Sequence, residues 1–197
     1  MPKNVDHESR RKDFVEAAYK TIIEEGLAKT TIRSVAKRAG YTTGALVHYF
    51  KDKDELIRYV LAENGRAVRA RMQDARRTAR GRDALRSVLL EALPVDKIKG
   101  ASWRIWLALW YHSEVSVAMR KEERLRYREW IGRITEILNE SVELGELRGD
   151  LSVPEEARSL VAFVDGLGVQ YLMSNGRRSS SQITGALDVY LGRLYNS

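Results

Sequence analysis

One glycine between two short helical patterns most constrains the fold of this chain. Gly40 follows apolar residues spaced as on one helix face, and a second such pattern begins a few residues later. A helix that ends in the left-handed conformation favours glycine, which has no Cβ to clash there. Ala36 is small enough for a crossing helix, and Leu46 can fill the angle between the helices. This spacing predicts a helix-turn-helix over residues 31–50, with Thr42 capping its second helix.

The exposed positions of this motif carry groups that suit DNA. They are cations, hydroxyls and aromatic donors, which contact phosphate oxygens and base edges. No Asp or Glu occurs between Thr30 and Lys51. A generic pair of short helices in an all-α core would share the apolar spacing but would not need this surface. The motif therefore favours binding to double-stranded DNA, through candidate contacts at Thr31, Arg33, Thr42, Thr43, Gly44, His48, Tyr49 and Lys53.

The same stretch resembles the TetR family of bacterial transcriptional repressors. The resemblance is carried by Gly26, Thr31-Ile32, Val35-Ala36, Ala39-Gly40, Gly44, Leu46, His48-Tyr49-Phe50, Lys53 and Leu56. It implies a dimeric, ligand-responsive repressor that inserts residues 42–49 into the major grooves of a palindromic operator. It further implies that Thr43, Gly44 and Tyr49 lie nearest the bases or the sugar-phosphate and that Arg33 reaches a base. Thr31, Thr42, His48 and Lys53 would hold phosphates.

The distribution of charge agrees with two domains. The chain of 197 residues has a net charge of +7, of which residues 1–53 contribute +4, from 11 Lys and Arg against 7 Asp and Glu. A basic segment on a nearly balanced remainder suits a polyanion-binding module joined to a second module. We expect a DNA-binding domain at residues 1–53 and a ligand-sensing and dimerisation domain at residues 54–197. An architectural DNA binder without a sensor is the alternative, and it would bind many sequences with similar affinity.

Other classes of protein have little support in the composition. Cysteine is absent, and the three histidines, His7, His48 and His112, are too dispersed for a metal site. No nucleophile has a neighbouring base in a recognisable arrangement, so neither an enzyme nor a cofactor is expected. No apolar run approaches the roughly 20 residues that span a bilayer, and residues 1–12 lack an apolar signal segment. A cytoplasmic protein without membrane contact is therefore predicted.

Apolar periodicity predicts an all-α fold of about nine helices. Three form the N-terminal helix-turn-helix domain, and the others form the helical C-terminal domain. We expect residues 1–8 to precede the first helix and residues 96–100 to form a loop. Ser102 is expected to cap a short helix over residues 102–112.

Seven arginines crowd the end of the long helix expected over residues 52–79 and the turn after it. They are Arg66, Arg69, Arg71, Arg76, Arg77, Arg80 and Arg82. A second DNA-binding patch is one interpretation, but Arg77 lies about 36 Å along the helix from Lys53 at 1.5 Å per residue. A solvated face is therefore favoured, and an anionic partner is the remaining alternative.

Three of the four tryptophans share one face of the helix expected over residues 102–112. Trp103, Trp106 and Trp110 lie within about 60° of one another at 100° per residue, and Glu114 falls on the same side if the helix continues. A core stripe would explain each tryptophan singly. Together, aromatic rings that converge on a carboxylate would form a cavity for a cation.

The segment 155–174 adds a second set of candidates. Gly166 and Gly168 fall inside the expected helix, where glycine costs roughly 1 kcal/mol relative to alanine, so another helix or a ligand is expected to approach closely. Phe163, Leu167 and Tyr171 lie on or beside its apolar side. This helix and the one expected over residues 179–195 either seal one core or pair across a two-fold axis. A homodimer is favoured, because a palindromic operator needs two reading heads.

A looser resemblance extends through this region. Ile105-Trp106-Leu107-Ala108-Leu109-Trp110 and Val164-Asp165-Gly166-Leu167 are similar to the C-terminal domain of the choline-responsive betaine-pathway repressor group. It implies a small-molecule effector, cationic or amphipathic, held by residues among Trp103, Trp106, Trp110, Glu114, Phe163, Leu167 and Tyr171. Gly168 departs from such a cage, since it offers no side chain.

Overall fold

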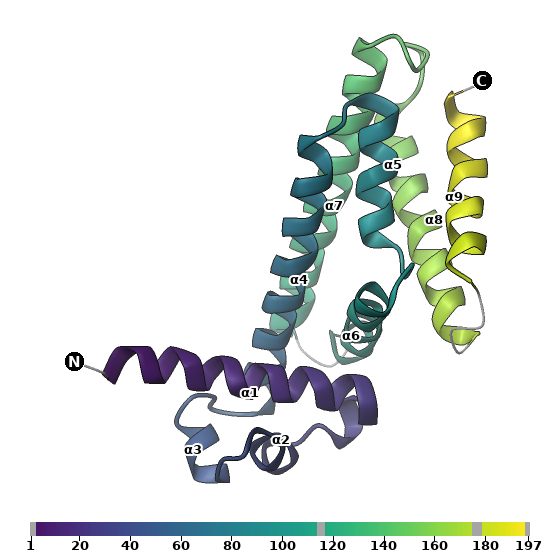
Figure 1. Cartoon of the computed structure of the whole chain (residues 1–197). Helices are drawn as coiled ribbons and strands as arrows, with labels where there is room; N and C mark the ends of the chain where they lie inside the picture. Colours follow the sequence, from purple (N-terminus) through teal and green to yellow (C-terminus); the bar gives the residue numbers. More distant parts are fainter. Residues whose placement is uncertain (1–2, 114–116, 175–178, 196–197) are drawn as a thin grey trace. The chain divides into compact units, whose positions relative to one another are not determined.

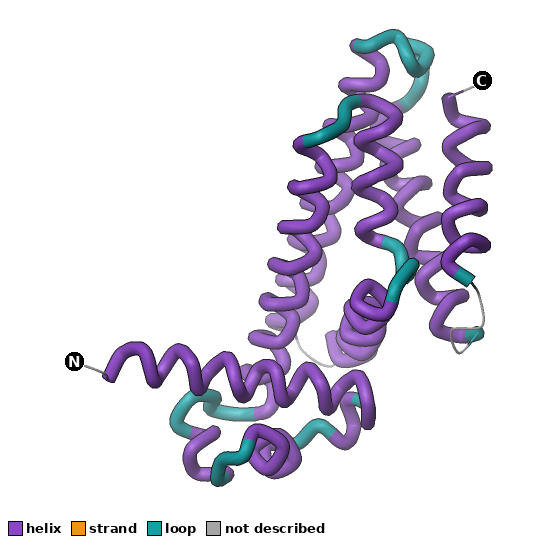
Figure 2. Tube along the Cα trace, viewed as in Figure 1, coloured by secondary structure: helices purple, strands orange, loops and turns teal. Residues whose placement is uncertain are grey.

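A computed structural model describes residues 3–113, 117–174 and 179–195, and every regular element within those ranges is a helix (Figure 2). The all-α prediction is confirmed, with nine α-helices and one short 3-10 helix in the described ranges. In chain order these are α1 (Lys3–Glu25), η1 (Leu27–Lys29), α2 (Ile32–Ala39), α3 (Thr43–Val47), α4 (Lys53–Arg77), α5 (Gly81–Ala92), α6 (Lys97–Ser113), α7 (Val117–Glu143), α8 (Val153–Met173) and α9 (Ser180–Tyr195) (Figure 1).

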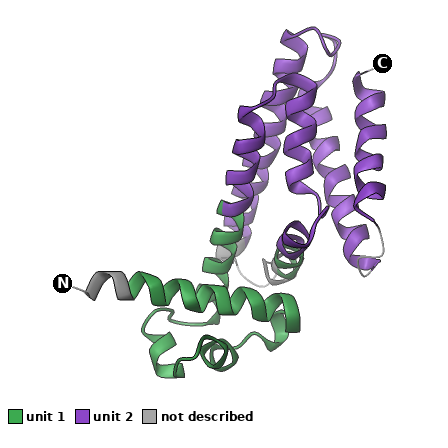
Figure 3. Ribbon diagram, in the orientation of Figure 1, with its two compact units in different colours: residues 1–66, 104–112 green, residues 67–103, 113–197 purple. Residues whose placement is uncertain are grey.

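The chain divides into two compact units (Figure 3). Unit 1 comprises Met1–Arg66 and Arg104–His112, and unit 2 comprises Ala67–Trp103 and Ser113–Ser197. Helices α4 and α6 therefore each contribute residues to both units. No helix in the described part of the chain combines the length and the apolarity that a membrane crossing needs.

In unit 1, α1 packs on α2, and α2 packs on α3. Apolar residues four apart along α1 bury one face of the helix, which Phe14 and Ala18 mark. Val35, Leu46 and Phe50 of the same unit are fully buried. The aromatic rings of Phe14 and Phe50 meet edge to face with centroids 6.4 Å apart. This core fixes the short helix α3 from behind and leaves its opposite face outside.

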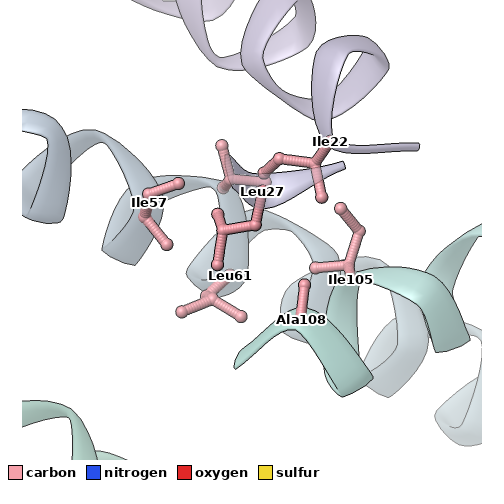
Figure 4. Close-up of a pocket in the computed structure, with 7 residues that line it drawn as sticks. Ile22, Leu27, Ile57, Leu61, Ile105 and Ala108 are labelled. Atoms are coloured by element: carbon pink, nitrogen blue, oxygen red, sulfur yellow. The ribbon is translucent and has the colours of Figure 1, made fainter. Parts of the chain in front are cut away.

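A small cavity remains in unit 1 and is lined by apolar side chains only. Six of them are Ile22, Leu27, Ile57, Leu61, Ile105 and Ala108 (Figure 4). Its volume is about 10 Å³, which is at the lower limit for one water molecule. The cavity is therefore a packing void and too small for an organic ligand.

Unit 2 is a helical bundle in which α7 packs against α5 and α8, and α5 packs against α9. Its buried residues follow helical spacing, as the periodicity predicts. Pairs such as Leu85 and Leu89 on α5, or Leu187 and Leu191 on α9, are almost fully buried.

Two glutamates of α7 and its following turn hold the beginning of α5. Glu140 accepts hydrogen bonds from Arg76 Nη2 at 2.7 Å, from Arg80 Nε at 2.8 Å and from the N–H of Gly81 at 3.1 Å. Glu146 accepts from the N–H of Arg82 at 2.7 Å. The Arg80 side chain and the Gly81 N–H lower the pKa of Glu140 to about 2, with Arg76 contributing. This carboxylate clamp fixes the turn between α4 and α5 to α7.

The first helix begins earlier than the sequence suggested. Helix α1 starts at Lys3, so the expectation that residues 1–8 precede it was wrong for residues 3–8. His7 adds a tertiary contact, since its ring centroid is 5.3 Å from that of Tyr49.

Helix α6 also begins earlier than expected, because its cap is Asp96. The carboxylate Oδ1 of Asp96 accepts from the N–H of Lys99, and its carbonyl accepts from the N–H of Gly100, both at 2.8 Å. Ser102 is buried inside the helix and does not cap it, so the loop predicted at residues 96–100 was wrong for residues 97–100. Glycine leaves room for Tyr171 at this position, because an added Cβ would lie only 3.2 Å from the Tyr171 hydroxyl.

Candidate nucleic-acid interface and ligand-binding region

The turn of the helix-turn-helix has the geometry that its glycine predicts. Gly40 has φ 78° and ψ 21°, in the left-handed region. Its N–H donates to the Lys37 carbonyl at 3.2 Å, and the N–H of Tyr41 donates to the Ala36 carbonyl at 2.9 Å. These two bonds form a Schellman motif, which closes α2 and directs the chain into α3.

Both threonines that begin these helices are caps. Thr31 Oγ1 accepts from the N–H of Ser34 at 3.0 Å, and Ser34 Oγ accepts from the N–H of Thr31 at 2.9 Å, which completes a capping box. Thr42 Oγ1 accepts from the N–H of Ala45 at 3.1 Å. The side chain of each threonine remains exposed. The Thr42 hydroxyl therefore still has its own hydrogen to offer to an acceptor such as a phosphate oxygen.

Lys53 lies at the first position of α4 and is only partly exposed. Its Nζ donates to the Leu27 carbonyl at 2.9 Å, which uses one of the three ammonium hydrogens and fixes the side chain. Arg33 on α2 and His48 at the end of α3 are exposed. The structure thus keeps the cationic candidates at the surface of unit 1.

The outer face of α3 contains two of the predicted residues and one that the sequence reading missed. Thr43 and Gly44 are exposed, as expected for groups near DNA. Val47, one turn after Thr43, is 52% exposed, while Leu46 is fully buried. Sequence reasoning passed over Val47 because an aliphatic residue is usually assigned to a core. Its helical spacing from Thr43 was the available signal.

Tyr49 is half-buried in a cluster of aromatic rings. Its ring centroid lies 5.5 Å from that of Phe14 and 5.3 Å from that of His7. The ring is therefore held against α1, beside the end of α3.

Some cations of unit 1 stabilise the fold. Arg38 binds Glu24 and Glu25 at 2.6 Å each, which joins α2 to the end of α1, and the hydrogen bond to Glu24 makes the largest contribution to raising the pKa of Arg38. The Arg11 guanidinium lies 4.0 Å from the centroid of the Tyr59 ring. Both side chains therefore make contacts within unit 1 that stabilise its fold.

Most arginines of the segment 66–82 also form ion pairs. Within the chain, Arg66 pairs with Glu63, Arg71 with Glu91, Arg77 with Asp74, and Arg76 and Arg80 with Glu140. Five of the seven arginines thus face a carboxylate. This pairing favours an ion-paired surface over a second DNA-binding patch.

Trp103 is buried in unit 2, with 6% of its surface exposed. Its Nε1 donates to the Ala92 carbonyl at 2.7 Å. Its ring occupies the space beside Gly168, where an added Cβ would lie 2.2 Å from the indole. The close approach predicted at Gly168 is therefore that of Trp103. A Cβ on Gly166 would meet nothing within 4 Å.

The other ligand candidates have different surroundings. The Phe163 ring lies 4.7 Å from that of Tyr190 on α9, Leu167 is buried, and Tyr171 is half-buried beside Gly100. Trp106 and Trp110 are half-buried residues of unit 1. Glu114 lies outside the described residues.

Sequence reasoning also missed a half-buried carboxylate of α8. Asp165 Oδ2 accepts a hydrogen bond of 2.7 Å from the Tyr127 hydroxyl of α7. Burial raises the pKa of Asp165, and the hydrogen bond from Tyr127 opposes this shift. Asp165 occurs in the quoted sequence Val164-Asp165-Gly166-Leu167, but nothing in its spacing indicated Tyr127 as its partner.

Two family models match the chain. The model of bacterial regulatory proteins of the tetR family matches residues 14–60, and that of the C-terminal region of BetI-type transcriptional repressors matches residues 81–196. The chain is 30% identical over 184 residues to the HTH-type transcriptional regulator PksA of Bacillus subtilis (strain 168), covering 93% of this chain and 88% of that protein. It is 32% identical over 178 residues to the HTH-type transcriptional regulator BetI of Paraburkholderia xenovorans (strain LB400), covering 88% and 87%.

Solved structures have the same fold. A transcriptional regulator from Rhodococcus sp. Rha1 matches with a TM-score of 0.84 and 24% identity, covering 94% of this chain and 96% of that chain. A transcriptional regulator from Saccharomonospora viridis, solved in complex with choline, matches with a TM-score of 0.88 and 23% identity, covering 93% and 96%.

Proposed function

Because the chain belongs to the TetR family of transcriptional regulators and carries a BetI-type C-terminal domain, we propose that it is a dimeric, ligand-responsive repressor of a palindromic operator. The observation that carries the proposal is the outer face of α3, which is exposed, free of acidic residues and directed by the Gly40 turn. The DNA-binding domain is assigned to residues 1–53, and the sensing and dimerisation domain to residues 54–197.

On the operator, α3 enters a major groove and the surrounding residues hold the backbone. Thr43, Gly44 and Tyr49 lie nearest the bases or the sugar-phosphate, and Arg33 reaches a base from α2. The proposed phosphate contacts are Thr31, Thr42, His48 and Lys53. The capping bonds of the threonines and the bond of Lys53 to Leu27 support this role, because they fix these side chains before DNA binds.

The outer faces of α8 and α9 support a homodimer. Each helix carries a stripe of small and apolar residues, all of them exposed except the half-buried Gly166 and Gly192. The stripe consists of Ser159, Ala162, Gly166 and Met173 on α8, and of Ser181, Gly185, Val189 and Gly192 on α9. A Cβ on any of the three glycines would meet nothing within 4 Å of its own chain, so the fold does not require glycine there. A second copy that approaches closely would explain them, as a four-helix interface across a two-fold axis.

The effector is proposed to be a cationic or amphipathic small molecule. Aromatic faces attract quaternary ammonium groups, and a structural neighbour was solved with choline. The proposed lining comes from Trp103, Trp106, Trp110, Glu114, Phe163, Leu167 and Tyr171. Binding would shift α4 and change the spacing of the two reading heads, which must match major grooves about 34 Å apart.

The DNA-binding proposal is tested by fluorescence anisotropy on the intergenic DNA beside the protein's own gene. Specific binding should weaken several-fold in His48→Ala and in Lys53→Ala. The matched control Lys121→Ala removes an exposed cation of α7 and should bind as the wild type does. Binding without sequence preference, unaffected by either substitution in α3 or α4, would favour the architectural alternative.

The effector proposal is tested by thermal shift with choline, other quaternary amines, polyamines and fatty-acyl compounds. A cation site predicts stabilisation by the amines, and its loss in Trp106→Ala or Glu114→Gln. Stabilisation by fatty-acyl compounds alone would contradict a cationic effector.

A further inference from the structure

We propose that Val47 reads the methyl group of a thymine, and thereby selects a T·A pair at one position in each operator half-site. The inference rests on the proposed function, because it assumes that α3 lies in a major groove. It adds a specificity determinant that the motif residues do not supply.

Val47 lies at the centre of the outer face of α3. At 100° per residue it is 40° from Thr43, 60° from Gly44 and 100° from His48, all of which are exposed. The helical backbone continues through His48, with φ −69° and ψ −21°. A groove that accepts this face therefore meets the isopropyl group of Val47 between a hydroxyl and an imidazole.

The exposure of Val47 has no explanation within its own unit. Its side chain is 52% exposed, and it is the one large hydrophobic side chain that is exposed among those described in unit 1. The core residues of α2, α3 and α4 are already well buried without it. A single exposed aliphatic residue is ordinary on a general surface. On a face of only four residues, the others of which are polar or small, it indicates an apolar partner.

The major groove offers one apolar feature, the C5 methyl group of thymine. Valine has no hydrogen-bonding group, so it cannot distinguish bases by their donors and acceptors. It can distinguish them by the contact between its methyl groups and that of thymine. The expected discrimination is therefore against cytosine, and against uracil, which differs from thymine only by this methyl group.

The absence of a side chain at Gly44 allows the close approach that such a contact needs. A Cβ on Gly44 would meet only Thr42 Oγ1, at 3.9 Å, so the fold leaves this side of the helix open. The absent side chain, three residues before Val47, lets the α3 backbone come near the groove floor. Val47 then reaches the base edges with its short side chain.

The experiment compares a binding operator with versions in which each symmetry-related pair of thymines is replaced by deoxyuridine. This replacement removes the methyl group and keeps every hydrogen-bonding group. Burial of one methyl group predicts a loss of about four-fold per half-site, or roughly 15-fold for two, at one pair of positions. Val47→Ala should bind the thymine operator more weakly, and should no longer distinguish thymine from deoxyuridine there.

Two further variants make the result specific. Val47→Thr keeps the branched shape and one methyl group, so it should retain a smaller preference for thymine. Leu125→Ala removes an aliphatic side chain that is 51% exposed on α7, and it should behave as the wild type does. Circular dichroism melts check that each variant folds.

Two outcomes would overturn the inference while the proposed function stands. In one, the wild type binds every deoxyuridine operator as tightly as the thymine operator. In the other, Val47→Ala loses the same affinity for both operators and keeps the wild-type preference, which would assign Val47 to the sugar-phosphate. Failure of the wild type to bind any specific DNA would instead overturn the proposed function itself.

Discussion

Gly44 is unfavourable for the stability of its helix but would allow the helix to approach DNA closely. Glycine inside a helix costs about 0.5–1 kcal/mol relative to alanine, and its φ is not in the left-handed region. A Cβ there would meet only one atom of the chain, at 3.9 Å. The fold therefore gains nothing from this glycine, whereas close approach of DNA would use it.

Gly44→Ala is expected to stabilise the protein by about 0.5–1 kcal/mol and to weaken operator binding by tenfold or more. The added methyl group suits the helix but stands between α3 and the groove. Urea unfolding and anisotropy measure the two effects. Gly132→Ala on α7, where an added Cβ also meets nothing within 4 Å, is the control and should gain stability without losing DNA affinity. Unchanged DNA binding in Gly44→Ala would show that this face does not approach DNA closely.

The conformation or role of a single residue could be predicted where its cause lies in residues nearby in the sequence. The left-handed turn at Gly40 and the cap at Thr42 depend on neighbours within four residues, and both are confirmed. A close approach at Gly168 was also predictable from its cost in a helix, but its partner Trp103 is 65 positions away in the sequence and left no local signal.

At the scale of elements, the carboxylate clamp gives the end of α4 a fixed point. Glu140 binds both arginines that flank the α4–α5 turn, and Glu146 binds the N–H of Arg82. Any tilt of α4 that follows effector binding would then pivot about this end. Movement would be greatest at the opposite end of α4, which begins at Lys53.

The clamp predicts a pH dependence of stability. Because the folded-state pKa of Glu140 is lowered to about 2 from its ordinary 4.5, its contribution is fully present above pH 4.5 and is lost as the pH falls toward 2. Urea unfolding from pH 6 to pH 2 should show this loss in the wild type and a smaller one in Glu140→Gln. Glu136→Gln, an exposed neighbour one turn earlier on α7, should retain the wild-type dependence. Identical pH profiles for all three proteins would contradict the clamp.

The proposed dimer interface is tested on α9. Val189→Glu places a charge in the middle of the exposed stripe, so it should give monomers at concentrations where the wild type is dimeric, and operator affinity should fall by more than tenfold. Sedimentation velocity and anisotropy measure these changes. Leu125→Glu changes an equally exposed aliphatic residue of α7 and should leave both properties unaltered. Dissociation by Leu125→Glu alone would move the interface to α7.

Most helices were predictable because their apolar periodicity is long and their ends carry glycine, proline or a cap. The starts of α1 and α6 were not. Gly100 looked like a break, but it accommodates Tyr171, and Asp96 supplies the cap three residues before Lys99. The glycine that makes room for a side chain of α8 was therefore misinterpreted as the sign of a loop.

At the scale of the whole molecule, α4 and α6 are the helices with residues in both units. The signal proposed to pass from an effector to the DNA-binding residues would therefore have continuous helical paths along the chain. The sequence could indicate two functional parts from the charge of residues 1–53. It could not indicate that residues 104–112 of α6 join the N-terminal unit, because that depends on tertiary contacts with Ile22, Leu27 and Ile57.

Coupling between effector and operator must be reciprocal. If an effector lowers operator affinity by a given factor, saturating operator should lower effector affinity by the same factor. Isothermal titration with and without operator DNA measures both sides of this cycle for whichever amine stabilises the protein. Equal effector affinities in the presence and absence of operator would contradict ligand-controlled repression by that compound.

The contact between Trp103 and Gly168 also constrains how this chain can change over generations. Any larger residue at 168 would place its Cβ 2.2 Å from the indole while Trp103 remains. Shrinking Trp103 first leaves a cavity that costs about 3–5 kcal/mol, after which position 168 is open to substitution. The two positions can therefore diverge only in that order and through a weakened intermediate. The close packing of α6 on α8 at these two residues should therefore be retained in proteins that descend from this one.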